Sequence, residues 1–186
     1  RRGYSEEEVA AAKRAFESYS QTTLEQRLGW LENLLAIYKR RYGEVADTIT
    51  KELGAPTSMS HEQQAAAGTA HLEDFIVALK KLKTEETLYN GEHLLREPIG
   101  VCGLITPWNW PINQIVLKVI PALATGCTCV LKPSEFTPLN AMLYAEMIHE
   151  AGFEVEGNPG GVAPETPSQF RLPGDAPLLK PEMSSP

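Results

Sequence analysis

The chain has 186 residues, a formal net charge of −7 and a pI near 5.2. This length fits one ordinary domain, and the acidic balance argues against a nucleic-acid partner, because phosphate binding needs clustered lysine and arginine. No stretch reaches the roughly 18 apolar residues of a membrane span, and residues 1–8 lack the apolar core of a signal peptide. We therefore expect a cytoplasmic protein with no membrane partner.

The first eighty residues are predicted to be helical, because apolar side chains recur at intervals of three and four. Two capping-box patterns mark the first two helices: Ser5 with Glu8, and Thr23 with Gln26. A third short helix is expected between Gly43 and Gly54, and a fourth from about Ser58 to Leu82. The apolar stripes are interpreted as surfaces that face a core.

The periodicity changes at residue 88, where strand and turn signals begin. The expected elements are a turn over 89–92, a short strand over 93–97, a buried strand over 99–105, a helix over 112–125, a second buried strand over 127–131 and a helix over 139–151. Pro121 is expected to break the first of these helices, because proline removes an internal hydrogen bond.

The last 33 residues differ in kind from those before them. Residues 154–186 contain seven of the 14 prolines and no helical or strand period, a composition typical of disorder. The domain organisation inferred is a helical part over 1–87, a strand with a partial Rossmann-like unit over 88–153, and a disordered tail. The fold class is therefore α/β, with N-terminal helices followed by the first β-α-β-α of an incomplete parallel sheet.

Polar groups follow both buried strands, at the edge where open α/β sheets bind ligands. The turn after the first strand, Thr106–Pro111, has no glycine and cannot cradle phosphates as a glycine-rich loop does. Asn109 lies between two tryptophans and offers an amide donor that could stabilise a developing oxyanion. The alternative is a structural asparagine that bonds its own backbone in the turn.

The second strand ends in Lys132-Pro133-Ser134-Glu135. An acidic residue past the end of this strand is placed to accept hydrogen bonds from a ribose diol, and Lys132 could donate to the same ribose. The carboxylate of Glu135 would repel a 2′-phosphate, which favours NAD over NADP. The alternative is a surface Lys/Glu pair that caps the next helix.

The cysteines do not indicate a reactive or metal-binding site. Cys127 and Cys129 offer only two nearby ligands, so no metal is expected, and no histidine lies near any of the three cysteines in a triad-like setting. Alternation along a strand places Cys127 and Cys129 on one face as small buried side chains. We interpret both as structural.

Taken together, four segments resemble the NAD-dependent aldehyde dehydrogenase superfamily. They are REPIGV at 96–101, ITPWNWP at 105–111, PALATGCTCVLKPSE at 121–135 and TPL at 137–139. In this order and spacing they are highly specific, and the helical half also looks like the family's N-terminal helices. The resemblance covers residues 5 to 153, which makes this chain similar to an N-terminal fragment of that family.

The resemblance implies roles by position. Asn109 corresponds to the family's oxyanion-stabilising asparagine, and NAD is the implied cofactor. The cofactor-binding residues implied are Ile105, Thr106, Pro107, Trp108, Lys132, Ser134 and Glu135. The implied reaction is attack by a cysteine thiolate on an aldehyde, hydride transfer to NAD, and hydrolysis of the thioester to a carboxylic acid.

The family's nucleophilic cysteine and glutamate base lie downstream of the last matched helix. We therefore expect this chain to be truncated relative to the family and inactive alone, with a homo-oligomer as a further possibility. An alternative function is a non-catalytic nucleotide-binding or interaction module that pairs with full-length homologues through an exposed sheet edge. A third possibility is a fragment with no function.

Overall fold

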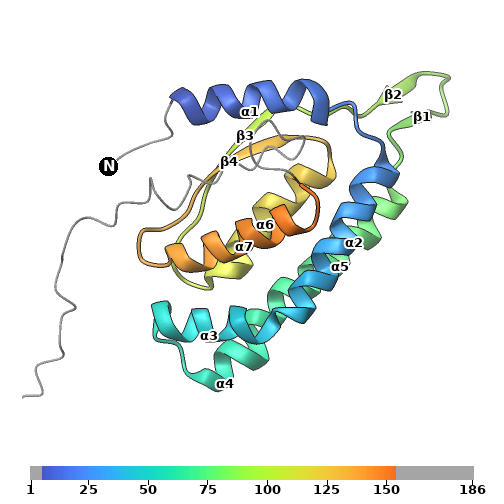
Figure 1. Cartoon of the computed structure of the whole chain (residues 1–186). Coiled ribbons are helices and arrows are strands. Elements are labelled where there is room, and N and C mark those ends of the chain that lie inside the picture. The colour runs from blue at the N-terminus through green and yellow to red at the C-terminus, as the bar shows by residue number, and fades with distance from the viewer. Residues whose placement is uncertain (1–5, 154–186) are drawn as a thin grey trace, which may run out of the picture.

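The computed structural model describes residues 6–153 (Figure 1). The expected capping box at Ser5 and the expected tail lie outside these residues. The helices are α1 (Glu6–Tyr19), α2 (Leu24–Arg40), α3 (Tyr42–Leu53), α4 (Thr57–Met59), a π-helical turn η1 (Ser60–Gln64), α5 (Ala65–Lys81), α6 (Pro111–Ala124) and α7 (Pro138–Glu150). The strands are β1 (Glu85–Thr87), β2 (His93–Leu95), β3 (Val101–Ile105) and β4 (Thr128–Lys132).

The parallel pair β3–β4 lies between α1, on one face, and α6, on the other (Figure 1). The Thr128 hydroxyl donates to the backbone carbonyl of Ala12 at 2.9 Å, which ties β4 to α1. The Tyr19 hydroxyl donates to the carbonyl of Leu123 at 2.8 Å and so joins α1 to the end of α6. The predicted α/β class, with helices preceding an incomplete parallel sheet, is confirmed.

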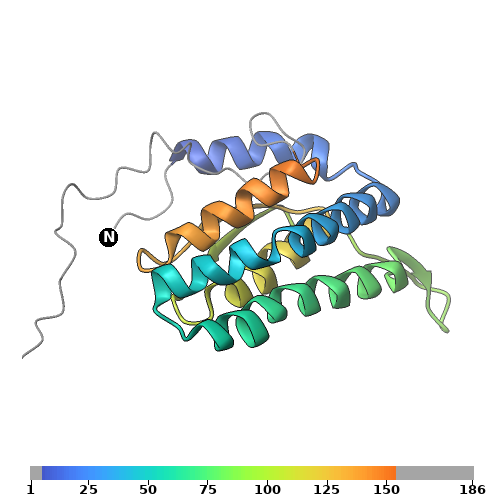
Figure 2. The same cartoon turned by 60° about the horizontal axis from the view of Figure 1, so that its bottom comes forward.

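A further helical layer covers α6 on the side away from the sheet. Helices α2 and α5 pack along α6, while α7 packs against α6, α2 and α3 (Figure 2). The Tyr38 side chain is completely buried in this layer, and its hydroxyl donates to the carbonyl of Ala65 at 2.8 Å. The apolar stripes predicted from the sequence therefore do face a core.

Several local predictions are confirmed. Thr23 and Gln26 form the reciprocal capping box at the start of α2. Gly54 ends α3 in the left-handed conformation that glycine adopts readily, at φ 75°. Gly43, in contrast, was expected before α3 and lies inside it. The expected turn over 89–92 joins β1 to β2, which form an antiparallel hairpin that projects from the body of the fold (Figure 1).

The predicted break at Pro121 is wrong, because α6 continues through it to Ala124. Proline inside a helix costs about 3 kcal/mol. Ile120 and Leu123 are both fully buried, and burial of each side chain stabilises the helix by about 1.5–3 kcal/mol. Packing therefore outweighs the loss of the hydrogen bond that a residue at position 121 would donate to the Leu117 carbonyl.

The expected burial of the first strand is also wrong. Residues of β3 are half-buried or exposed, and the Ile105 side chain remains 63% exposed. Within the described residues β3 pairs only with β4, so its other edge has no strand against it. β4 is buried over its first three residues, as predicted for the second strand.

Gly68 provides a test of the packing between α2 and α5. A Cβ atom at this position would overlap the hydroxyl of buried Tyr38, which is held by its bond to Ala65. We predict that Gly68→Ala lowers the free energy of unfolding by about 1–3 kcal/mol through overpacking. Denaturant titration measures this change.

Gly29 is the matched control, because it is also inside a helix and a Cβ atom added there would meet no other part of the chain within 4 Å. Gly29→Ala should raise the free energy of unfolding by about 0.5–1 kcal/mol through helix propensity alone. Equal stabilisation by both substitutions would show that Tyr38 does not occupy the space beside Gly68.

Candidate functional site

The candidate site lies at the carboxyl edge of the β3–β4 pair. Ile105 and Lys132 are register partners, and the Thr106 amide donates to the Lys132 carbonyl at 3.2 Å. The two polar segments singled out in the sequence therefore leave the sheet side by side, although 26 residues separate Thr106 from Lys132. The parallel ladder itself brings the 106–110 turn and the 132–137 loop together.

The turn between β3 and α6 has a buried base and an exposed tip. Thr106 is buried, whereas Pro107, Trp108 and Asn109 are exposed. Trp110 adopts a left-handed backbone conformation, φ 53° and ψ 57°, which costs a non-glycine residue about 1–3 kcal/mol. Pro111 begins α6 immediately afterwards, and its fixed φ suits the first helical position.

The side chain of Asn109 makes no hydrogen bond with the residues that the structure describes. The alternative in which this amide bonds its own backbone therefore does not describe this turn. Strained backbone residues such as Trp110 cluster at functional sites, where the surrounding structure holds the strain. The geometry leaves the carboxamide free to act on a ligand.

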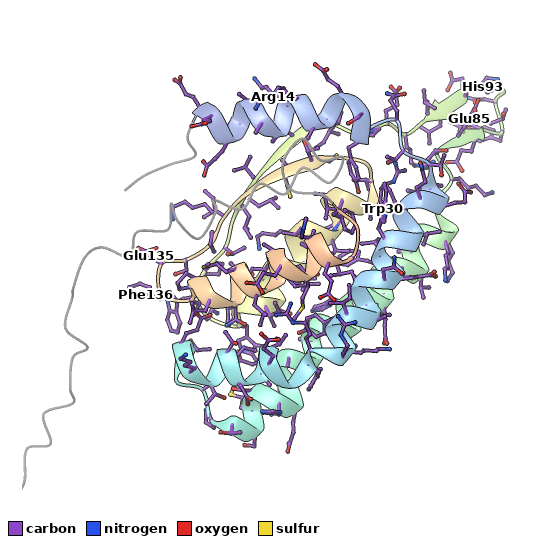
Figure 3. All side chains as sticks on the ribbon, in the orientation of Figure 1. Arg14, Trp30, Glu85, His93, Glu135 and Phe136 are labelled. Atoms are coloured by element: carbon purple, nitrogen blue, oxygen red, sulfur yellow. The ribbon has the colours of Figure 1, made fainter. Side chains whose placement is uncertain are left out.

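The loop between β4 and α7 is held by internal bonds. The Ser134 hydroxyl accepts from the Phe136 amide at 3.3 Å, and the Ser134 carbonyl accepts from the Thr137 amide at 3.2 Å. Ser134 and Thr137 are buried, whereas Glu135 and Phe136 are exposed at the tip of the loop (Figure 3). The hydroxyl of Ser134 thus bonds within the loop, whereas the carboxylate of Glu135 is exposed to solvent.

Glu135 does not cap α7, and it forms no ion pair with Lys132 in the described part of the chain. The cap comes instead from Glu52 on α3. Its carboxylate accepts from the backbone amides of Leu139 at 2.7 Å and Asn140 at 2.9 Å, and from the Asn140 side chain. The alternative of a Lys/Glu pair capping the next helix is therefore not what the structure contains.

The cysteine side chains lie within or beside the two strands. Cys127 and Cys129 are buried, and Cys102 is the register partner of Cys129. Burial raises the pKa of the Cys129 thiol to about 12 and, with the nearby Cys127 as a smaller cause, also raises the pKa of Cys102. Because the thiolate is the nucleophile, neither group is activated at neutral pH.

Among residues 6–153, no group of three or more histidine, cysteine or acidic side chains is arranged to hold a metal ion. No helix in that range is long and apolar enough to cross a membrane. The arrangement offers a free amide, a lysine and a carboxylate beside an apolar sheet edge. Such a set can bind a polar organic ligand.

Two positioning contacts were not found from the sequence. One is the Glu52 cap on α7. The other joins α5 to the first turn of α6, where His71 Nε2 lies 2.7 Å from the Asn113 side-chain oxygen. Glu52 and Leu139 are 87 residues apart, and no local pattern marks either contact.

The chain matches the model of the aldehyde dehydrogenase family over residues 4–162, which extends beyond residue 153. It is 48% identical over 145 residues to 3-succinoylsemialdehyde-pyridine dehydrogenase of a Pseudomonas species, covering 77% of this chain and 30% of that protein. An aldehyde dehydrogenase from Bartonella henselae superposes with a TM-score of 0.78 at 47% identity, over 83% of this chain and 32% of its own.

A mutant aldehyde dehydrogenase C from Pseudomonas syringae, in complex with NAD+ and octanal, also superposes with a TM-score of 0.78. It is 41% identical, and the match covers 83% of this chain and 31% of that one. The chain therefore spans about a third or less of the length of these relatives.

The burial of Cys129 generates a testable prediction. We expect alkylation of the folded chain at pH 8 to leave Cys129 unmodified, because its thiol is enclosed and its pKa is raised. Peptide mass spectrometry measures the labelling, and the same reaction in guanidinium should modify all three cysteines. Rapid labelling of Cys129 in the folded state would show an accessible, activated thiol.

Proposed function

The chain belongs to the aldehyde dehydrogenase family, and we propose that its 105–110 and 132–135 segments form one side of an NAD-binding cleft. The whole enzyme would oxidise an aldehyde to a carboxylic acid. The observation that carries this proposal is the register of Ile105 with Lys132, because it brings Asn109 and Glu135 to one edge of the sheet.

The residues present fit the adenosine half of NAD. Glu135 is exposed, and the N-terminus of α7 is capped by Glu52 instead. The Glu135 carboxylate is therefore available to accept two hydrogen bonds from a ribose diol. Lys132 ends β4 beside it and can donate to the same sugar. A carboxylate at this place disfavours a 2′-phosphate by charge repulsion, so NAD is proposed rather than NADP. The exposed apolar faces of Ile105 and Trp108 would border the cofactor.

Asn109 is proposed to donate its amide hydrogen to the oxygen of the reacting aldehyde as negative charge develops there. A donor held in place before the reaction stabilises such charge without reorganisation. The turn supports this role, because Trp110 and the rigid start of α6 fix the backbone on one side of Asn109. NAD supplies the hydride acceptor when bound.

The described cysteines do not provide a nucleophile for this reaction. Cys127 and Cys129 are buried, and the pKa values of Cys102 and Cys129 are raised. We therefore propose that residues 1–186 on their own do not oxidise aldehydes, and that they contribute cofactor contacts and the oxyanion donor. Thiol-dependent NADH formation by the isolated chain would contradict this division of roles.

A second candidate function is a non-catalytic module that pairs with longer homologues. The observation that favours it is the half-exposed β3, which has one neighbouring strand among the described residues. An unpaired edge can template further pairing. Co-elution with a longer relative, without any nucleotide binding, would favour this function over the first. A homo-oligomeric state and a cytoplasmic location stay predictions.

Glu135 gives the direct test of the proposed cofactor site. We predict that Glu135→Ala weakens the binding of NAD by about tenfold, the loss expected for a hydrogen bond to a charged group. It should also reduce the preference for NAD over NADP, because the repelling charge is gone. Calorimetric titration of the folded chain measures both.

Glu92→Ala is the matched control, because Glu92 is an exposed acid in the β1–β2 turn, remote from the β4–α7 loop. It removes the same charge and should leave both affinities unchanged. If both substitutions weaken NAD binding equally, the effect comes from the change in net charge. The support for a ribose contact at Glu135 would then be removed.

A further inference from the structure

The N-terminus of α7 is capped across the fold by a side chain from α3. The Glu52 carboxylate accepts the Leu139 and Asn140 amides, the second and third residues of α7, together with the Asn140 side chain. Thr137 stands at the ordinary capping position and makes no side-chain cap. One acidic residue, 85 positions upstream of that capping position, therefore satisfies the free amides of this helix.

A second acidic residue, Glu135, lies two residues before Thr137 in the sequence. The free amides and the dipole of a helix N-terminus attract carboxylates, and Glu135 is the nearest acid in the chain before α7. If Glu135 bonded these amides, its carboxylate would turn toward the helix and be lost to a ligand. In the structure Glu52 occupies them, and Glu135 remains exposed at the loop tip (Figure 3).

Glu52 also completes the anchoring of the loop. The loop begins at Lys132, where the Thr106 amide bonds the Lys132 carbonyl, and ends at Pro138, just before the residues that Glu52 binds. Ser134 and Thr137 are buried between these points, and only Glu135 and Phe136 are exposed. The loop is thus fixed at both ends, with its tip displayed to solvent.

We propose that Glu52 is a positioning residue: by capping α7 it keeps the Glu135 carboxylate available for the ribose of a nucleotide. The inference rests on the proposed cofactor site, and it adds a residue of the helical layer to that site. Without Glu52, Glu135 takes over the cap, and the discrimination between ribose with and without a 2′-phosphate is lost.

The first experiment needs no ligand. Amide hydrogen exchange of Leu139 and Asn140 is measured by NMR in the folded chain and in Glu52→Ala, Glu135→Ala and the double variant. Glu135→Ala alone should leave exchange unchanged. In the Glu52→Ala background the same substitution should speed exchange by about tenfold, because Glu135 has become the cap. An equal effect of Glu135→Ala in both backgrounds overturns the proposal.

The second experiment measures discrimination rather than affinity. Dissociation constants are determined for 5′-AMP and for 2′,5′-ADP, which differ by the 2′-phosphate. Glu52→Ala should reduce the preference for 5′-AMP about tenfold, and adding Glu135→Ala should change it no further. Glu52→Gln keeps one acceptor oxygen at the same length and should restore part of the preference. A purely structural role would weaken both ligands equally and leave their ratio unchanged, which overturns the proposal.

Asp47→Ala is the control, because Asp47 is an exposed acid on the same helix that contacts His61 and not α7. Asp47→Ala should show the same amide exchange and the same preference for 5′-AMP as the unsubstituted chain. If the unsubstituted chain binds neither nucleotide, the proposed cofactor site fails, whereas the exchange experiment still decides the role of Glu52. If Glu52→Ala does not fold, Glu52→Gln with and without Glu135→Ala gives the comparison with a smaller expected difference, because glutamine keeps one acceptor oxygen; no difference between the backgrounds would still overturn the proposal.

Discussion

The parallel register of β3 and β4 is the constraint on which the rest of the site depends. Five consecutive pairs run from Val101 with Thr128 to Ile105 with Lys132, and the ladder continues into the Thr106 amide. Because parallel strands end at the same edge, the two polar segments meet without any direct bond between their side chains. A shift of one residue would turn Cys129 toward the opposite face and displace Lys132 from Ile105.

The helical layers make this two-stranded ladder stable enough to carry a site. α1 and α6 cover its two faces, while Tyr19 and Tyr38 join helices through buried hydroxyl-to-carbonyl bonds. Burial raises the pKa of both tyrosines, so each stays a protonated donor at physiological pH. The same layers reach the site itself, through Glu52 at α7 and His71 at α6. Helices that the sequence indicated only as packing elements therefore also contact the two segments of the candidate site.

Local rules predicted what depends on neighbouring residues. The capping box at Thr23, the left-handed end at Gly54 and the buried second strand each follow from a few adjacent positions, and the structure contains them. The misses depend on packing and pairing that no single segment of the sequence encodes. Packing of Ile120 and Leu123 keeps α6 intact through Pro121. The short acidic strand β1, which was not expected from the sequence, pairs with β2 in a hairpin.

The candidate site likewise has parts that the sequence predicts and parts that it does not. The segments that carry Asn109 and Glu135 were identified from motif spacing, and parallel strand order predicted that they would meet. Their local conformations were not predictable: Trp110 adopts a left-handed conformation, and Ser134 turns inward to the loop. No local sequence pattern marks the cap that Glu52 provides, because its partners Leu139 and Asn140 are 87 and 88 residues away.

The central claim is that the two segments act as one nucleotide site. An NMR titration of the folded chain with NAD tests it most directly, because each backbone amide reports separately. We predict that amides of residues 106–110 and 132–137 shift together with a single dissociation constant, while those of the β1–β2 turn do not move. Shifts confined to one segment, or different dissociation constants for the two, would contradict a shared site.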